Sequence, residues 1–216
     1  MAERQPTDSR QVQIADAALQ VIAEEGLGGF TTAAIGKLVG LTSGSLFRHF
    51  PSKQAIVRAA IARADELLFA AFPPQGGNPL DRLGAFFRQR VRLVAKNPGI
   101  ARVVFSEQLA QAAGDKGRTA VGAIKQRSLE FIRECVTQAA DEGLLVEGLD
   151  VEAVVTLVSG AALAIVFTEA PTGRELPGEE RAERVWSTLQ ALLGKRVDLA
   201  SRPRGEPRGR ERRAAR

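Results

Sequence analysis

Apolar residues recur at helical spacing along most of the chain, and no segment shows the regular alternation that predicts a β-strand. The first helical face consists of Ile14, Ala17, Ala18, Val21 and Ile22. Glycine, proline and asparagine residues separate the periodic segments. The expected helices span residues 8–26, 32–39, 43–50, 53–72, 79–96, 98–113, 117–143, 150–169 and 178–197. This pattern predicts an all-α protein of about nine helices.

The longest nearly apolar run extends from Ala153 to Thr168. Its sixteen residues are fewer than the roughly 20 that a membrane-spanning helix needs. We therefore interpret this run as a buried helix of a globular protein. Because no apolar stretch follows the first five residues, we also expect no signal peptide and a cytoplasmic location.

The stretch from Thr31 to Lys53 has the layout of a helix-turn-helix, in which Gly40 lies in the turn between two short helices. Thr31 and Thr42 are suited to cap these helices. In such a unit the second helix enters the DNA major groove and the first crosses the backbone. The apolar residues expected to pack the two helices together are Ile35, Leu38, Val39, Leu46 and Phe47.

The other face of the second helix carries side chains that suit DNA. These residues are Thr42, Ser43, Ser45, Arg48 and His49. Hydroxyl groups suit phosphate oxygens, and arginine suits either guanine or a phosphate. Gly44 permits a close approach to the groove, and no acidic residue occurs between Thr31 and Ala64. Hairpins of this kind also occur in helical bundles that bind no DNA, so the spacing alone leaves that alternative open.

The net charge of +5 belongs to the C-terminal tail. Residues 202–216 contain seven Arg and two Glu, so residues 1–201 are formally neutral. The tail lacks large apolar residues and is expected to be disordered. The basic isoelectric point therefore does not by itself identify a nucleic-acid-binding protein.

The composition argues against an enzyme. One Cys and one His exclude an internal disulfide framework and argue against a zinc site. The chain contains neither a phosphate-binding G-x-x-x-x-G-K-[ST] loop nor a dinucleotide-binding G-x-G-x-x-G motif. We therefore expect no catalysis, no metal and no cofactor.

Residues 31–53 read TTAAIGKLVGLTSGSLFRHFPSK, and a helix of about 17 residues precedes them. This order resembles the TetR/AcrR family of one-component transcriptional regulators. The resemblance is specific over residues 10–60 and only architectural over 79–197. It implies a sequence-specific DNA-binding regulator, most simply a repressor that a ligand releases from a pseudo-palindromic operator.

The resemblance assigns DNA contacts residue by residue. It implies that the first helix of the unit begins at Thr31 and Thr32, which touch phosphate, and that Lys53 contacts phosphate. The recognition surface would comprise Thr42, Ser43, Gly44, Ser45, Arg48 and His49. Two features depart from the family pattern. Phe47 replaces the usual tyrosine and removes its hydroxyl, and Gly36-Lys37 replaces a common alanine-containing pair.

The resemblance also implies a homodimer with a ligand-binding C-terminal domain. The expected divisions are a helix-turn-helix domain at 1–52, an effector-binding and dimerisation domain at 53–198, and a disordered Arg-rich tail at 199–216. The last two helices, at about 150–169 and 178–197, would form the dimer interface. Burial within a single subunit is the alternative explanation for the apolar helix at 150–169.

A small, largely apolar effector is expected, because few polar side chains lie among the candidate pocket residues. These candidates are Phe86, Phe87, Arg90, Val94, Val104, Phe105, Gln108, Phe131, Cys135 and Phe167. Each apolar member also suits an ordinary core position. The competing function is a non-specific nucleic-acid-binding or architectural protein that uses the Arg-rich tail.

Overall fold

The computed structural model describes residues 7–167 and 178–195. These residues form ten helices and no β-strand, which confirms the all-α prediction. The helices are α1 (Thr7–Gly29), α2 (Thr32–Val39), α3 (Ser43–His49), α4 (Lys53–Phe69), α5 (Pro79–Lys96), α6 (Pro98–Phe105), α7 (Glu107–Ala112), α8 (Gly114–Asp141), α9 (Val151–Phe167) and α10 (Gly178–Leu193). The predicted tail at 199–216, residues 168–169 and residues 196–197 lie outside the described residues.

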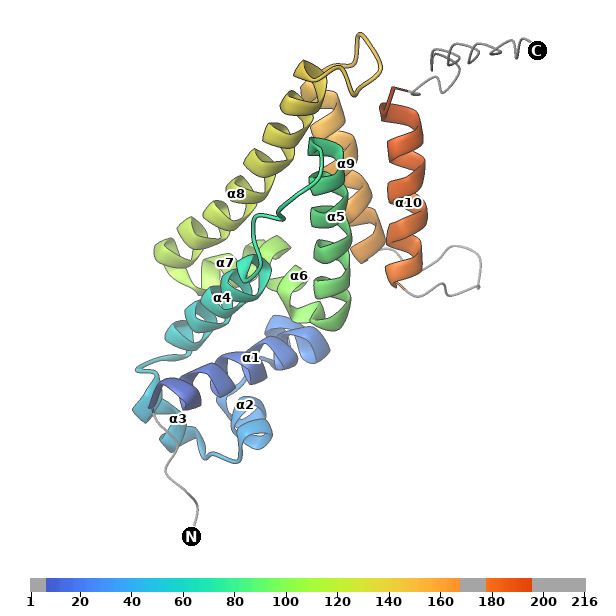
Figure 1. The fold of residues 1–216 in the computed structure, drawn as a ribbon. Helices are drawn as coiled ribbons and strands as arrows, with labels where there is room; N and C mark the ends of the chain where they lie inside the picture. The colour runs from blue at the N-terminus through green and yellow to red at the C-terminus, as the bar shows by residue number, and fades with distance from the viewer. Residues whose placement is uncertain (1–6, 168–177, 196–216) are drawn as a thin grey trace, which may run out of the picture.

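Helices α1, α2 and α3 form one end of the molecule, and α5, α8, α9 and α10 run along the other (Figure 1). Helix α4 extends from the first group towards the second, while α6 and α7 lie between the two groups (Figure 1). One hydrophobic core joins α1, α2 and α3 to α4, α6 and α8. A second core fills the space between α5, α8, α9 and α10, around Trp186. The first core is continuous across the domain boundary that we predict at residues 52 and 53.

Side-chain caps fix the starts of the three helices after α1. The Oγ atom of Thr31 accepts a hydrogen bond from the amide of Ala34 at 3.1 Å. Thr42 accepts from Ser45 at 3.2 Å, and Ser52 accepts from the amide of the residue three positions later at 3.1 Å. Each cap satisfies an amide that has no partner within its own helix. The predicted caps at Thr31 and Thr42 are confirmed.

Gly36 allows the turn between α2 and α3 to fold back closely. A Cβ atom at this position would overlap the carbonyl oxygen of Leu41. The amide of Leu41 also donates to the carbonyl oxygen of Gly36 at 2.8 Å. Gly40, with a φ of 65°, ends α2 in the left-handed region. The glycine that departs from the family pattern therefore has a local packing role.

The predicted helix at 98–113 is wrong, because the chain breaks at Ser106 into α6 and α7. The hydroxyl of Ser106 accepts from the amide of Leu109 at 3.3 Å and so caps α7. Buried apolar residues continue on both sides of this break, as Val104 and Leu109 do, so the periodicity concealed it. The break separates α6, which packs against α1, from α7, which packs against α8.

Candidate DNA interface and effector cavity

The recognition helix α3 is anchored from below and presents polar groups outwards. Leu46 of α3 is fully buried, whereas Thr42, Gly44 and Arg48 are exposed. Ser43 and His49 are half-buried, as is the next serine, Ser45. The outward-facing groups therefore lie on one face of a helix whose opposite face is fixed in the core.

Hydrogen bonds hold the residues of this face in place. The hydroxyl of Thr32 donates to Ser43 at 3.2 Å and joins α2 to α3. The backbone carbonyl of His49 accepts from the side chain of Gln11 at 3.1 Å, which ties the end of α3 to α1. The structure thus brings most of the predicted DNA-contacting residues together on one rigid unit, although whether each touches DNA stays a prediction.

Two residues that we expected to pack α2 against α3 are exposed instead. Leu38 is 44% exposed and Phe47 is 46% exposed. The expectation was wrong because it counted apolar residues without knowing how the short helices cross. Phe47 therefore lies at the surface, next to Arg48 in the sequence.

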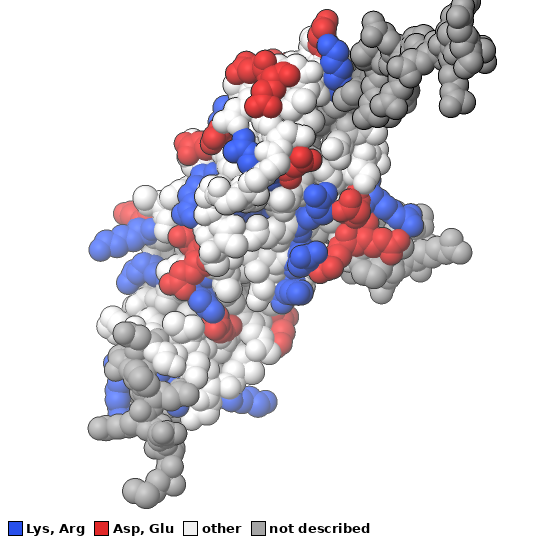
Figure 2. All heavy atoms as spheres, in the orientation of Figure 1, with Lys and Arg blue, Asp and Glu red and all other residues white. Residues whose placement is uncertain are grey.

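The local charge of this end is positive. Lys37, Arg48 and Lys53 are exposed, and no acidic residue occurs between Thr31 and Ala64. The visible surface at this lower end shows basic side chains and no acidic ones (Figure 2). Lys53 lies in the first turn of α4, and its ammonium group is 5.4 Å from the centre of the Phe30 ring. A cation at a helix start is slightly unfavourable by itself, so the position suits a bound phosphate.

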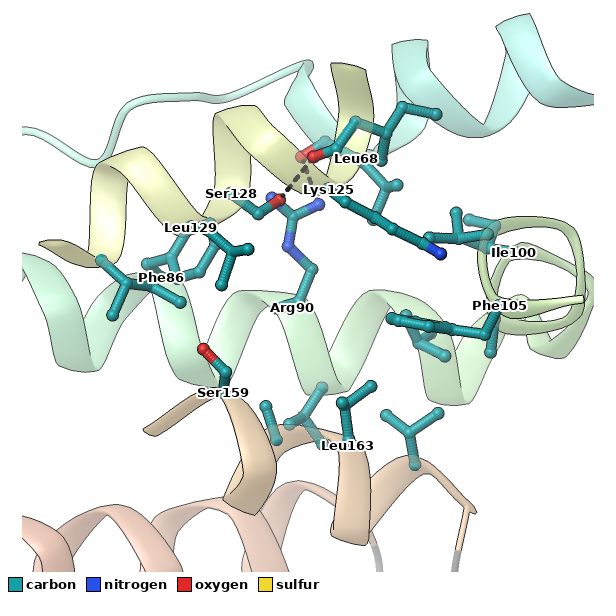
Figure 3. A pocket seen from close by; sticks show the side chains of 18 residues that line it. Leu68, Phe86, Arg90, Ile100, Phe105, Lys125, Ser128, Leu129, Ser159 and Leu163 are labelled. Carbon is teal, nitrogen blue, oxygen red and sulfur yellow. Dashed lines mark hydrogen bonds between the residues drawn. The ribbon is translucent and has the colours of Figure 1, made fainter. Parts of the chain in front are cut away.

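A cavity of about 240 Å³ lies between α5, α6, α8 and α9. Its volume is just below the range of roughly 300–1,000 Å³ that is common for ligand pockets. Five of the predicted pocket residues line it: Phe86, Arg90, Val94, Val104 and Phe105. Their side chains come from α5 and α6, and side chains of α8 and α9 lie on two opposite sides of the cavity (Figure 3).

The other candidates lie elsewhere. Phe87, Phe131 and Cys135 are buried in the second core. Gln108 is exposed on α7, and Phe167 borders a neighbouring hollow. The sequence interpretation chose other residues of α8 and α9 than the ones that line the cavity, which are Ile124, Lys125, Ser128, Leu129, Ile132, Ser159, Ala162, Leu163 and Val166. These α8 positions recur every three or four residues, and this spacing was the available signal.

Arg90 is a half-buried charged residue of the cavity wall. Its side chain rises from α5 towards α4 and α8, and Nη1 donates to the carbonyl oxygen of Leu68 at 3.1 Å (Figure 3). The guanidinium carbon lies 4.8 Å from the centre of the Phe69 ring and 4.7 Å from that of Phe86. Burial, together with the positive charge of Arg127, lowers the pKa of Arg90 to about 10. The side chain therefore remains a cation at neutral pH.

Several contacts connect the cavity region to the N-terminal helices. Arg90 reaches the last turn of α4, as described above. Arg102 of α6 donates to the carbonyl oxygen of Ile22 in α1 at 3.1 Å. Gly99 lies so close to α1 that a Cβ atom would be 2.8 Å from the carbonyl carbon of Leu19. Arg63 of α4 pairs with Asp16 of α1 at 2.7 Å. A change in the cavity wall thus has direct routes to the helices that hold α3.

The outer faces of α9 and α10 expose apolar side chains. Leu157 is 56% exposed and Leu192 is 68% exposed. Val154, Val155 and Val158 of α9 are buried within the subunit. Helix α9 is therefore consistent with both explanations that the sequence left open, burial within one subunit and a dimer interface. One of its faces is part of the core, and another is exposed and available to a partner.

The fold and the exposed face of α3 define a DNA-binding protein of the helix-turn-helix class. Residues 14–60 match the family model described as "Bacterial regulatory proteins, tetR family". This match covers the helix-turn-helix domain, which resembles those of this family, and the chain is a DNA-binding transcriptional regulator.

Comparison with known proteins agrees with this assignment. The chain is 28% identical over 167 residues to a nucleoid occlusion factor, SlmA, of Marinobacter nauticus, a match that covers 74% of this chain and 80% of that protein. It is 27% identical over 172 residues to the transcriptional repressor KstR2 of Mycobacterium tuberculosis, covering 77% and 84% of the two chains.

Solved structures share the fold. The structure of KstR2 from Mycobacterium tuberculosis has a TM-score of 0.72 and 23% identity, and the match covers 87% of this chain and 96% of that one. AibR in complex with isovaleryl coenzyme A and operator DNA has a TM-score of 0.69 and 23% identity, covering 83% and 97%. Among the described residues, no helix is both long and apolar enough to cross a membrane.

Proposed function

We propose that this protein is a repressor that binds a pseudo-palindromic operator as a homodimer and releases it when an effector fills the cavity. The observation that carries the proposal is the direct contact between the cavity wall and the helices that hold α3. A ligand can change DNA affinity only if it favours one arrangement of these helices over another. The hydrogen bonds from Arg90 to Leu68 and from Arg102 to Ile22 supply such a connection.

The proposed DNA contacts follow the exposed face of α3. Arg48 reaches base edges or phosphates, and Thr31, Thr32 and Lys53 hold the backbone. The remaining contacts come from Thr42, Ser43, Gly44, Ser45 and His49. Phe47 adds an exposed aromatic surface that suits the methyl group of thymine. Two copies related by a two-fold axis would place their α3 helices in successive major grooves.

The proposed dimer forms through the exposed faces of α9 and α10. Leu157 and Leu192 are large apolar side chains that are exposed to solvent in the single chain. Pairing these helices with those of a second copy would bury them. Because a transcriptional regulator acts by binding DNA, we propose a cytoplasmic protein that needs neither a catalytic step nor a metal.

The proposed effector is a small molecule with a largely apolar body. Apolar side chains form most of the cavity wall. AibR, which shares the fold, has been solved with isovaleryl coenzyme A, a compound whose acyl group is small and branched. An acyl group of that size suits a cavity of about 240 Å³.

The test of DNA recognition is a mobility-shift titration with the DNA upstream of the protein's own coding region and with other genomic fragments. Arg48→Ala should remove the preference for one fragment over random DNA. Lys53→Ala should weaken binding to both and lower the slope of affinity against salt concentration by about one.

The matched control for these two variants is Arg133→Ala. Arg133 pairs with Glu152 at 2.6 Å on a surface of α8, away from the helix-turn-helix. This variant should bind DNA like the wild type. If no genomic fragment forms a complex that resists competitor DNA, the repressor assignment is wrong.

A second candidate is a chromosome-associated factor of the kind named in the SlmA relatives. The identity with those proteins favours it, and it shares the DNA-binding domain. It predicts occupancy of many chromosomal sites without a change in transcription of the neighbouring genes. Chromatin immunoprecipitation combined with transcript profiling of a deletion strain distinguishes the two roles.

A further inference from the structure

Arg90 is a half-buried cation that has no ion-pair partner among the described residues. Among the described residues its only hydrogen bond goes to the neutral carbonyl oxygen of Leu68. The acidic residue that acts on its charge is Asp65, and the carboxylate of Asp65 pairs with Arg127 at 3.8 Å. Removing a charge from water without a counter-ion is costly, whereas pairing it with an anion offsets that cost.

The lining of the cavity suits an anion that carries an apolar body. Its charged lining residues are both cations, Arg90 and Lys125, and no Asp or Glu lines it. Lys125 is exposed and lies beside Phe105, with Nζ 5.3 Å from the ring centre, at one end of the cavity. The remaining lining is apolar apart from two serines, each of which donates its hydroxyl proton to a carbonyl of its own helix.

The contact with Leu68 gives Arg90 a second role. Leu68 lies in the last turn of α4, where carbonyl groups have no partner within the helix. A cation there satisfies one carbonyl and interacts favourably with the helix dipole. Arg90 therefore stabilises the end of the helix that leads back to the helix-turn-helix.

We propose that the cavity binds an apolar carboxylic acid, whose carboxylate takes the guanidinium of Arg90 away from Leu68 and so loosens the end of α4. A carboxylate accepts charge-assisted, bidentate hydrogen bonds from arginine, which are stronger than a single bond to a neutral carbonyl. The ligand thus has a greater affinity for the state in which α4 has lost this contact. This inference rests on the proposed effector-controlled function and adds the chemical class of the effector.

The experiment measures ligand binding by calorimetry on the full chain without DNA. The probes are octanoate, 1-octanol and octanoyl coenzyme A. Wild-type protein should bind octanoate at least about tenfold more tightly than 1-octanol, because only octanoate forms the charge-assisted bonds. In Arg90→Met the two affinities should become equal, and Arg90→Lys should keep part of the difference.

The control variant is Arg92→Met, two positions along the same helix. Arg92 is exposed and pairs with Glu179 at 2.7 Å, outside the cavity lining. It should keep the full preference for octanoate. Circular dichroism and thermal melts show whether each variant is folded. Equal affinity of the wild type for octanoate and 1-octanol overturns the proposal, as does tighter binding of octanoyl coenzyme A that Arg90→Met leaves unchanged.

Hydrogen exchange tests the second half of the proposal. Octanoate should speed amide exchange in the last turn of α4 in the wild type and in Arg92→Met, but not in Arg90→Met. Unchanged exchange in the wild type at saturating octanoate overturns the displacement of Leu68. Both measurements omit DNA, so they can fail while the mobility shift succeeds, and the reverse holds as well.

Discussion

Gly99 lies in the first turn of α6, where that helix crosses α1. A Cβ atom there would overlap the carbonyl oxygen of Leu19, and would lie 2.8 Å from its carbonyl carbon and 3.2 Å from its Cα. All three are backbone atoms of α1, so no side chain can rotate to make room. Gly99→Ala therefore has to separate α6 from α1.

The expected cost follows from opposing terms. Alanine in a helix is favoured over glycine by up to about 1 kcal/mol. Overpacking in a dense core costs about 1–3 kcal/mol. Separating the helices also weakens the hydrogen bond from Arg102 to Ile22, which is worth about 1 kcal/mol. We expect a net loss of about 1–3 kcal/mol in the free energy of unfolding.

Thermal and urea unfolding followed by circular dichroism measure this loss. For a chain of this size, each kcal/mol shifts Tm by about 2–4 °C, so Tm should fall by roughly 2–12 °C. DNA affinity should fall as well, because α1 is part of the unit that holds α3.

The matched control is Gly122→Ala in α8, where no atom outside the helix lies within 4 Å of the added Cβ. This variant should be as stable as the wild type or more stable by up to about 1 kcal/mol. If Gly99→Ala is as stable as Gly122→Ala, the close crossing of α1 and α6 does not exist in solution and the reasoning fails.

Three further predictions concern the rest of the molecule. Burial raises the pKa of Cys135 to about 11, so Ellman's reagent at pH 8 should modify it far more slowly in the native than in the urea-unfolded protein; equal rates would show that the thiol is accessible. Leu157→Glu with Leu192→Glu should convert a dimer to a monomer in analytical ultracentrifugation, and an unchanged sedimentation coefficient would exclude this interface. Ser106→Ala should lower the free energy of unfolding by about 1 kcal/mol through loss of the α7 cap; an unchanged urea midpoint would count against the cap to Leu109.

The helices and their caps could be predicted because they depend on residues a few positions apart. Thr31 and Thr42 each lie three positions before the amide that they cap, and the apolar residues of each helix recur every three or four positions. The polar face of α3 could be located in the same way. The one split that the sequence concealed, at Ser106, fell where apolar residues continue through the break.

The cavity could be predicted only in part. Arg90 was a candidate because it is a polar residue among the apolar pocket candidates of its helix, but its hydrogen bond joins residues 22 positions apart. Phe131 and Cys135 looked equally suitable as lining residues, yet α8 turns them into the second core. Which face of a helix meets a cavity depends on the rotation of that helix against neighbours distant in sequence.

The sequence by itself determined the all-α architecture, the capped helix-turn-helix and the neutral body with a basic recognition surface. These features follow from local hydrogen bonding and from the chemistry of adjacent side chains. Only the tertiary structure decided that Phe47 is exposed, that Gly99 touches α1, and that Arg90 connects the cavity to α4. Those features depend on the crossing of helices that are far apart along the chain, and dense packing allows only certain crossings.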